Sequence, residues 1–118
     1  MVSHNKISQS TYSHIKNFFC TNKEEELCGI IVDAINGGRF IECENIASDR
    51  VYYFHINPCV FIDNKVDLVV HSHCMGSARP STLDIKCSES MDIPFLIYSI
   101  LDDNFCLYQN KSVLSFKV

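Results

Sequence analysis

A mostly apolar run that ends in two closely spaced histidines constrains this chain more than any other feature. Residues 66–70 lead directly into His71 and, one position later, into His73. Because side chains alternate along a strand, both imidazoles should point to the same face. A polar loop follows, and then Ser81 and Asp84 stand at the spacing of a helix N-terminus. The pattern predicts a strand, a loop and a helix that bring two imidazoles and a carboxylate together.

Two imidazoles and a carboxylate are typical ligands of a catalytic zinc ion. Three protein ligands leave a fourth position for water, whereas structural zinc sites are closed by four protein ligands. We therefore expect His71, His73 and Asp84 to bind Zn²⁺. Ser81 with Asp84 alone would be an ordinary helix start, and the two histidines alone could be surface residues. Their occurrence together favours a site, because sites in α/β proteins collect at the carboxyl ends of strands.

The remaining segments predict one α/β or α+β domain over residues 1–118, with a mixed β-sheet and flanking helices. Helices are expected at residues 8–19, capped by Ser8 or Ser10, at 81–91, and as a turn or short helix from Pro58. Strands are expected at residues 27–35, 39–46, 52–56, 67–73, 95–101, 105–109 and 112–118. An Asn-Gly-Gly run at residues 36–38 predicts a hairpin between the first two strands. Residues 1–8 are expected to be a loose start.

Composition and charge argue against several functional classes. The net charge is −4 and the basic residues are scattered, so neither nucleic acid nor a membrane surface is an expected partner. The longest apolar stretches are too short to span a bilayer, and residues 1–15 lack the apolar core of a signal peptide. The seven cysteines are odd in number and contain no Cys-x-x-Cys pair. A reducing, cytoplasmic setting without a disulfide framework is therefore expected.

The same residues resemble the zinc motif of the JAMM, or MPN-domain, metallopeptidases. The chain carries His71, His73, Ser81 and Asp84 in the order His-x-His-x7-Ser-x2-Asp, and residues 26–31 (Glu-Leu-Cys-Gly-Ile-Ile) resemble the segment with the family's catalytic glutamate. Further similarity lies at residues 44–47, 53–58 and 93–99. The resemblance covers roughly residues 14–110. It looks closest to the JAMM domain of phage tail-assembly proteins and to small prokaryotic JAMM proteins.

This resemblance implies an MPN-like fold and hydrolysis of a peptide or isopeptide bond. Glu26 would be the general base that takes the proton of a zinc-activated water, and Ser81 would donate a hydrogen bond to the oxyanion. We prefer Glu26 to Glu24 and Glu25 because it immediately precedes the buried strand and stands two residues before Cys28. The substrate would be a protein or peptide, such as a ubiquitin-like tail or a phage protein.

Four residues around the motif need separate predictions. Cys74 stands where the family usually has proline, and its thiol could coordinate the metal, although strand alternation favours a side chain that points away. Cys87 follows Asp84 by three residues, so it should lie at the floor of the site or in the core. Met75 and Arg79 belong to the loop that is best placed to touch substrate.

Two other functions compete with the zinc metallopeptidase. The first is a non-catalytic MPN-type scaffold or phage tail-assembly module that binds a protein partner. It is less favoured because all the expected site residues are present. The second is a nucleotide deaminase, which needs His-x-Glu and Pro-Cys-x-x-Cys, and the chain has neither. The half-exposed pattern of residues 39–46 also predicts an edge strand that could pair with a partner or a substrate tail.

Overall fold

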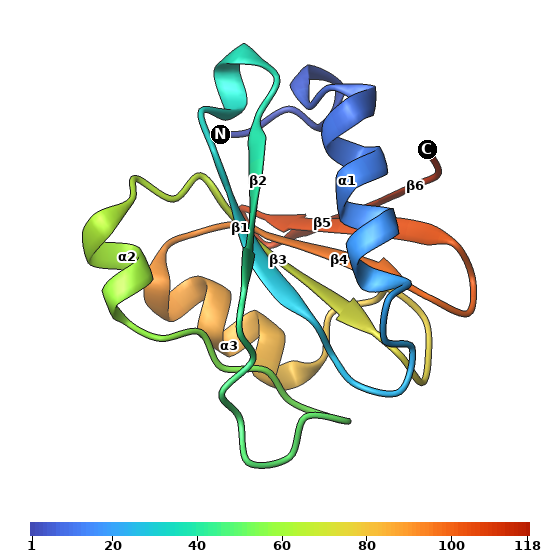
Figure 1. Ribbon diagram of the computed structural model, residues 1–118. Helices are drawn as coiled ribbons and strands as arrows, with labels where there is room; N and C mark the ends of the chain where they lie inside the picture. The colour runs from blue at the N-terminus through green and yellow to red at the C-terminus, as the bar shows by residue number, and fades with distance from the viewer.

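Six strands form one mixed sheet in the order β2-β1-β3-β4-β5-β6 in a computed structural model that describes residues 1–118 (Figure 1). Only β3 and β4 run parallel, and every other neighbouring pair is antiparallel. The strands are β1 (Cys28–Val32), β2 (Arg39–Cys43), β3 (Leu68–His73), β4 (Phe95–Ser99), β5 (Asn104–Gln109) and β6 (Ser112–Phe116). A parallel pair needs a crossover, and helix α3 (Thr82–Met91) provides it between β3 and β4.

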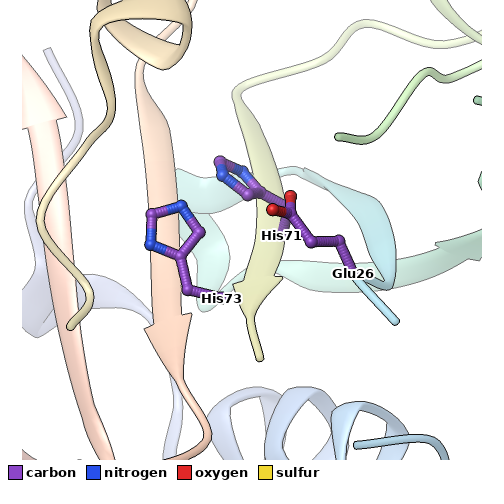
Figure 2. Close-up of side chains that lie close together, drawn as sticks. All are labelled: Glu26, His71 and His73. Atoms are coloured by element: carbon purple, nitrogen blue, oxygen red, sulfur yellow. The ribbon is translucent and has the colours of Figure 1, made fainter. Parts of the chain in front are cut away.

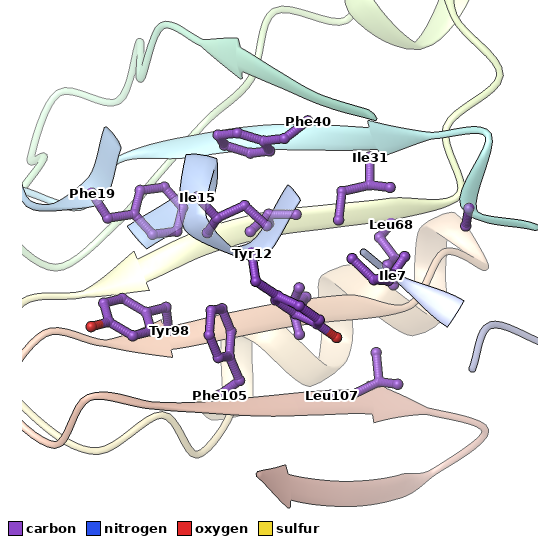
Figure 3. Close-up of a cluster of buried hydrophobic side chains, with 13 residues drawn as sticks. Ile7, Tyr12, Ile15, Phe19, Ile31, Phe40, Leu68, Tyr98, Phe105 and Leu107 are labelled. Carbon is purple, nitrogen blue, oxygen red and sulfur yellow. The ribbon is translucent and has the colours of Figure 1, made fainter. Parts of the chain in front are cut away.

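Helix α1 (Gln9–Phe19) covers one face of the sheet and closes the larger core. Its apolar residues recur at helical spacing, so they all face the strands. Figure 3 shows Tyr12, Ile15 and Phe19 lying over side chains from the strands. This core consists of thirteen buried residues: Ile7, Tyr12, Ile15, Phe19, Ile31, Ala34, Phe40, Leu68, Val70, Leu96, Tyr98, Phe105 and Leu107.

The opposite face carries α3 and the short helix α2 (Cys59–Asp63), and its core is smaller. Six buried residues form it: Cys28, Ile30, Ile56, Val69, Phe95 and Tyr108. Partly buried side chains of both helices, among them Phe61 and Ile85, pack against these six. The C-terminal ends of β3 and β4 and the start of α3 therefore meet on this thinner side.

Close contact between β1 and β2 depends on one glycine. A β-carbon at Gly29 would lie 2.4 Å from the carbonyl oxygen of Ile41 and 2.5 Å from the ring of Phe40. No larger residue fits there without moving backbone, so the strands can approach this closely only at glycine.

The structure confirms the mixed sheet with flanking helices in one compact α+β arrangement. Helix α1 begins where expected, with the Ser8 hydroxyl oxygen accepting a hydrogen bond from the Thr11 N–H at 3.2 Å. Helix α3 begins with the expected capping box between Ser81 and Asp84. Helix α2 follows Pro58, and β2 is an edge strand. No helix is both long and apolar enough to cross a membrane.

Strand bounds differ from expectation mainly at the first hairpin. The strand expected at residues 27–35 ends at Val32, because Asp33 adopts a left-handed conformation (φ 53°) and a 3-10 turn, η2 (Ala34–Asn36), follows. The Ala34 N–H donates to the Asp67 carboxylate at 2.8 Å, which draws the chain away from the ladder. The hairpin therefore exists, but its loop is longer than two residues. The following strand ends at Cys43 rather than at residue 46.

The strand expected at residues 52–56 does not form, and residues 44–58 have no regular ladder. Buried Asn45 replaces the missing hydrogen bonds. Its side-chain amide donates to the carbonyls of Glu26 (2.8 Å) and Tyr53 (3.0 Å), and its oxygen accepts from the N–H groups of Ala47 and His55. Because the two amide hydrogens and the two lone pairs of the Asn45 side chain all make hydrogen bonds to the backbone, this residue can hold an irregular segment in place.

The first eight residues, expected to be loose, pack against the domain. They contain a 3-10 turn, η1 (His4–Lys6), and the side chain of Ile7 is buried in the larger core. The Val2 N–H donates to the side chain of Gln109 on β5, and the Gln109 amide donates back to the Val2 carbonyl. These hydrogen bonds join the start of the chain to β5.

Candidate metal centre

The two histidines lie at the C-terminal end of β3 and point to the face that α3 covers. His71 is fully buried, and in register it lies between Cys28 of β1 and Ile97 of β4. His73, two residues later, is partly exposed, and the two ring centroids are 5.2 Å apart. Figure 2 shows both rings together with the carboxylate of Glu26. The expected pairing of the imidazoles on one face is therefore present.

Asp84 brings its carboxylate to both imidazoles from the first turn of α3. Its Oδ1 lies 3.2 Å from His71 Nε2, and its Oδ2 lies 3.1 Å from His73 Nε2. The capping box fixes this orientation, because the Ser81 N–H donates to Asp84 Oδ2 at 2.9 Å and the Asp84 N–H donates to Ser81 Oγ at 3.0 Å. A local helix cap thus aims the third expected ligand.

The hydrogen bonds of His73 determine which ring nitrogen is free to coordinate. Its Nδ1 lies 2.7 Å from the carbonyl oxygen of Ser77, and a carbonyl can only accept, so Nδ1 carries the proton. Nε2 lies 3.1 Å from Asp84 Oδ2, so it donates a proton to this carboxylate in the metal-free protein, and a bound cation would take the place of that proton. Metal-bound histidines commonly donate their other N–H to a carbonyl in this way.

Both ring nitrogens of His71 are buried without a hydrogen-bond partner. The ring is stacked on Phe54 with centroids 4.2 Å apart, and Asp84 Oδ1 approaches Nε2 without hydrogen-bond alignment. An unsatisfied buried polar atom costs about 1–3 kcal/mol. A cation held between Nε2 and the carboxylate would remove that cost at Nε2.

The spacing of these atoms fits a zinc ion. Tetrahedral zinc with nitrogen and oxygen ligands at about 2.0–2.1 Å places neighbouring ligand atoms about 3.3 Å apart. The separations from the Asp84 oxygens to the two Nε2 atoms are 3.1 and 3.2 Å, each to a different oxygen. Two imidazoles and a carboxylate form a donor set that suits Zn²⁺.

The charges around this point also suit a cation. Burial alone would raise the pKa of Asp84, but the imidazoles of His71 and His73 and its hydrogen bonds hold that pKa well below its usual range. Burial lowers the pKa of His71, which keeps this ring neutral. Burial would also lower the pKa of His73, but its hydrogen bonds to Asp84 and to the Ser77 carbonyl raise it. An ionised carboxylate thus lies against a neutral buried imidazole.

Glu26 approaches the imidazoles from the segment before β1. One carboxylate oxygen lies with ring nitrogens of His71 and His73 in a group whose atoms are all within 4.8 Å of one another (Figure 2). The side chain is buried, unlike exposed Glu24, whereas Glu25 forms a surface ion pair with Arg50. This difference agrees with the preference for Glu26. This carboxylate is therefore placed either to bind a metal directly or to act on a water beside it.

Burial raises the pKa of Glu26 to about 7. The charges of Asp84 and Asp49 add to this rise, and His73 opposes it. A carboxylate whose pKa lies near neutral pH can both accept and return a proton under ordinary conditions. Of the predicted residues, Asp84 thus contacts both His71 and His73, and Glu26 lies beside the two histidines.

The other predicted residues take different positions. The Ser81 hydroxyl lines the cleft beside the candidate centre, and Cys87 lines the same cleft. The Cys74 thiol donates to the Val51 carbonyl at 3.3 Å, and burial, followed by the charge of Glu26, raises its pKa. Met75 and Arg79 are exposed but lie outside the lining of that cleft, and their contact with substrate stays a prediction.

Sequence reasoning missed the wall of this cleft. Tyr52, Tyr53 and Phe54 line it, although their pattern predicted a strand. Three consecutive aromatic residues next to polar segments were the available signal. The side chains of Tyr52 (61%) and Tyr53 (50%) are at least half exposed, which is unusual for a strand that packs in a core.

Comparisons with known proteins find sequence similarity to a phage protein and a similar fold in a solved structure. The chain is 25% identical over 95 residues to the tail tip assembly protein K of Escherichia phage N15, covering 77% of this chain and 39% of that protein. It thus spans about two fifths of the relative's length. The fold resembles the solution structure of protein DSY2949 from Desulfitobacterium hafniense, with a TM-score of 0.68 and 17% identity over 94% of this chain and 88% of that one. No protein-family model matches the chain.

Proposed function

We propose that this chain is a zinc-dependent hydrolase of amide bonds, related to the JAMM metallopeptidases. The observation that carries the proposal is the convergence of two imidazole Nε2 atoms on the two oxygens of Asp84, at 3.1 and 3.2 Å. His71, His73 and Asp84 would hold the ion. Zinc in such a site lowers the pKa of a bound water towards neutrality and polarises a substrate carbonyl.

The chain's own groups would supply the proton transfers. Glu26, with a pKa raised to about 7, would accept a proton from the attacking water and return it to the leaving amine. The Ser81 hydroxyl oxygen accepts a hydrogen bond from the Asp84 N–H, so its own hydrogen is free to donate to the oxyanion. The capping box would hold this hydroxyl at a constant distance from the metal ligand Asp84.

Peptide cleavage by the zinc-loaded protein tests this function. Glu26→Gln removes the base while keeping the shape, and it should lower kcat by about 10²–10⁴-fold, which is the usual contribution of a positioned acid–base group. Glu24→Gln is the matched control, because Glu24 is exposed in the same turn. Wild-type protein that binds zinc but cleaves neither peptide nor isopeptide bonds would contradict the enzymatic proposal.

A second candidate function is a phage tail-assembly module that binds a protein partner. The similarity to a tail tip assembly protein supports this role more directly than it supports catalysis. The two functions are compatible, since a peptidase could act on a protein of the tail. Co-expression with the tail-tip proteins of the same phage, followed by size-exclusion chromatography, tests the module. Glu26→Gln should still co-elute with its partner if binding is the function, and separate elution would contradict it.

A further inference from the structure

A cleft of about 600 Å³ opens beside the candidate metal centre. Its lining includes Glu26, Ser81 and Asp84, so the cleft and the centre share three side chains. Sites for small molecules and side chains usually measure about 300–1,000 Å³. Any molecule that fills this cleft therefore lies against the groups to which we assign the chemistry.

The walls of the cleft are mainly apolar, with ten hydrophobic residues among the sixteen that line it. Tyr52 (61% exposed) and Tyr53 (50%) belong to one segment, and Leu83 (49%) and Met91 (38%) belong to α3. Large apolar side chains that gather around one hollow, rather than scattering singly, mark a binding surface. An apolar group that enters between these two walls would bury surface on both of them.

The charges of the lining limit what can enter. Glu26 and Asp84 are its only carboxylates, and it contains no lysine or arginine. An acidic side chain would meet these two carboxylates with only the His55 imidazole as a basic partner, and its desolvation would be poorly compensated. An uncharged apolar side chain carries no such cost. The lining therefore favours apolar over acidic occupants.

Asn45 joins one wall of the cleft to the candidate base. Its amide donates to the carbonyls of both Glu26 and Tyr53, and its oxygen accepts from the His55 N–H. Asn45 is buried, and all four of its hydrogen-bonding positions are used. The wall and Glu26 are thus held as one unit, so an occupant of the cleft has a fixed position relative to the centre.

We propose that this cleft binds an extended peptide through one bulky apolar side chain, aromatic or large aliphatic, and presents the neighbouring amide to the metal centre. The position of that amide rests on the function proposed above, whereas the apolar contact does not. The substrate class is therefore a protein segment with a residue such as phenylalanine or leucine beside the bond that is cut. Discrimination against alanine at that position should be at least about tenfold, because one methylene more or less in a hydrophobic pocket changes selectivity by about 10–200-fold.

Peptide binding to metal-free wild-type protein tests the proposal without requiring cleavage. Three fluorescein-labelled peptides that differ only in a central Phe, Ala or Asp are titrated and followed by fluorescence anisotropy. We expect the Phe peptide to bind at least about tenfold more tightly than the Ala peptide, and the Asp peptide to bind most weakly. Equal affinities for the three peptides, or no binding of any of them, would overturn the proposal.

Two matched leucine variants locate the contact. Leu83→Ala removes part of the cleft wall, whereas Leu101→Ala removes another exposed leucine (68%, against 49% for Leu83) that does not line the cleft. We expect Leu83→Ala to reduce the Phe-over-Ala preference several-fold and Leu101→Ala to leave it unchanged. The same effect in both variants would overturn the assignment to this cleft. Failure to bind zinc with the peptide preference intact would contradict the proposed enzyme and leave the cleft proposal standing.

Discussion

The two faces of the sheet, built by the same strands, differ in how much apolar surface they bury and in which polar groups they carry. The face under α1 buries thirteen apolar residues in one core (Figure 3), whereas the larger apolar cluster under α2 and α3 has six and adjoins an open cleft. Strand β3 shows the division directly: Val70 belongs to the first core, and its neighbours Val69 and His71 point to the other side. Stability is concentrated on one face, so the other can carry polar groups that are costly to bury.

Truncation on the α1 face should have the largest effect on stability and none on the metal. Phe19 is fully buried at the end of α1, and Phe19→Ala should lower the free energy of unfolding by about 3–5 kcal/mol. Phe18→Ala is the matched control, because Phe18 is only partly buried and should cost clearly less. Urea denaturation measures both values. A fall in zinc affinity of the folded Phe19→Ala protein would break the proposed separation of the two faces.

Removal of a ligand on the other face should do the reverse. His73→Ala should lower zinc affinity by more than about 100-fold, which is the upper end of the loss caused by removing only a ligand's supporting partner. His14→Ala is the control, because His14 is exposed on α1 and pairs with Glu42 on the surface. Competition with a chromogenic chelator measures both affinities. Equal zinc affinity in His73→Ala and wild type would remove His73 from the ligand set.

A smaller, pH-dependent effect should distinguish Glu26 from an ordinary buried residue. Burial raises its pKa from 4.5 to about 7, so the folded metal-free protein carries no penalty below about pH 4.5 and the full penalty above about pH 7. Glu26→Gln should therefore raise the Tm of the metal-free protein by a few degrees at pH 8, and the gain should disappear as the pH falls towards 4.5. Thermal denaturation at several pH values measures this, with Glu24→Gln as the control. A gain that does not change with pH would show that ionisation is not its cause.

Local signals account for most of the fold and for three members of the candidate centre. The apolar spacing of α1 and the capping box of α3 each depend on residues a few positions apart. Strand alternation alone places His71 and His73 on the same face. Asp84 could be placed because only one loop separates the strand from the helix that carries it. In each case the interacting groups are close in sequence, so propensity and periodicity were sufficient.

The segment between β2 and α2 could not be predicted in the same way. Its shape depends on Asn45, whose amide bonds to Glu26, nineteen residues earlier, and to Tyr53. Aromatic residues there line a cleft instead of joining the sheet, so their pattern indicated the wrong element. The raised pKa of Glu26 was equally hidden, because it arises from burial by distant parts of the chain.

Titration of metal-free wild-type protein with zinc in a calorimeter tests the central claim most directly. We expect one zinc ion per chain, with proton release that depends on pH, because a metal must displace the proton that His73 shares with Asp84. The same titration of His73→Ala should show little heat. Absence of stoichiometric zinc binding by the wild-type protein would contradict the assignment of His71, His73 and Asp84 as a metal centre, and with it the proposed hydrolase.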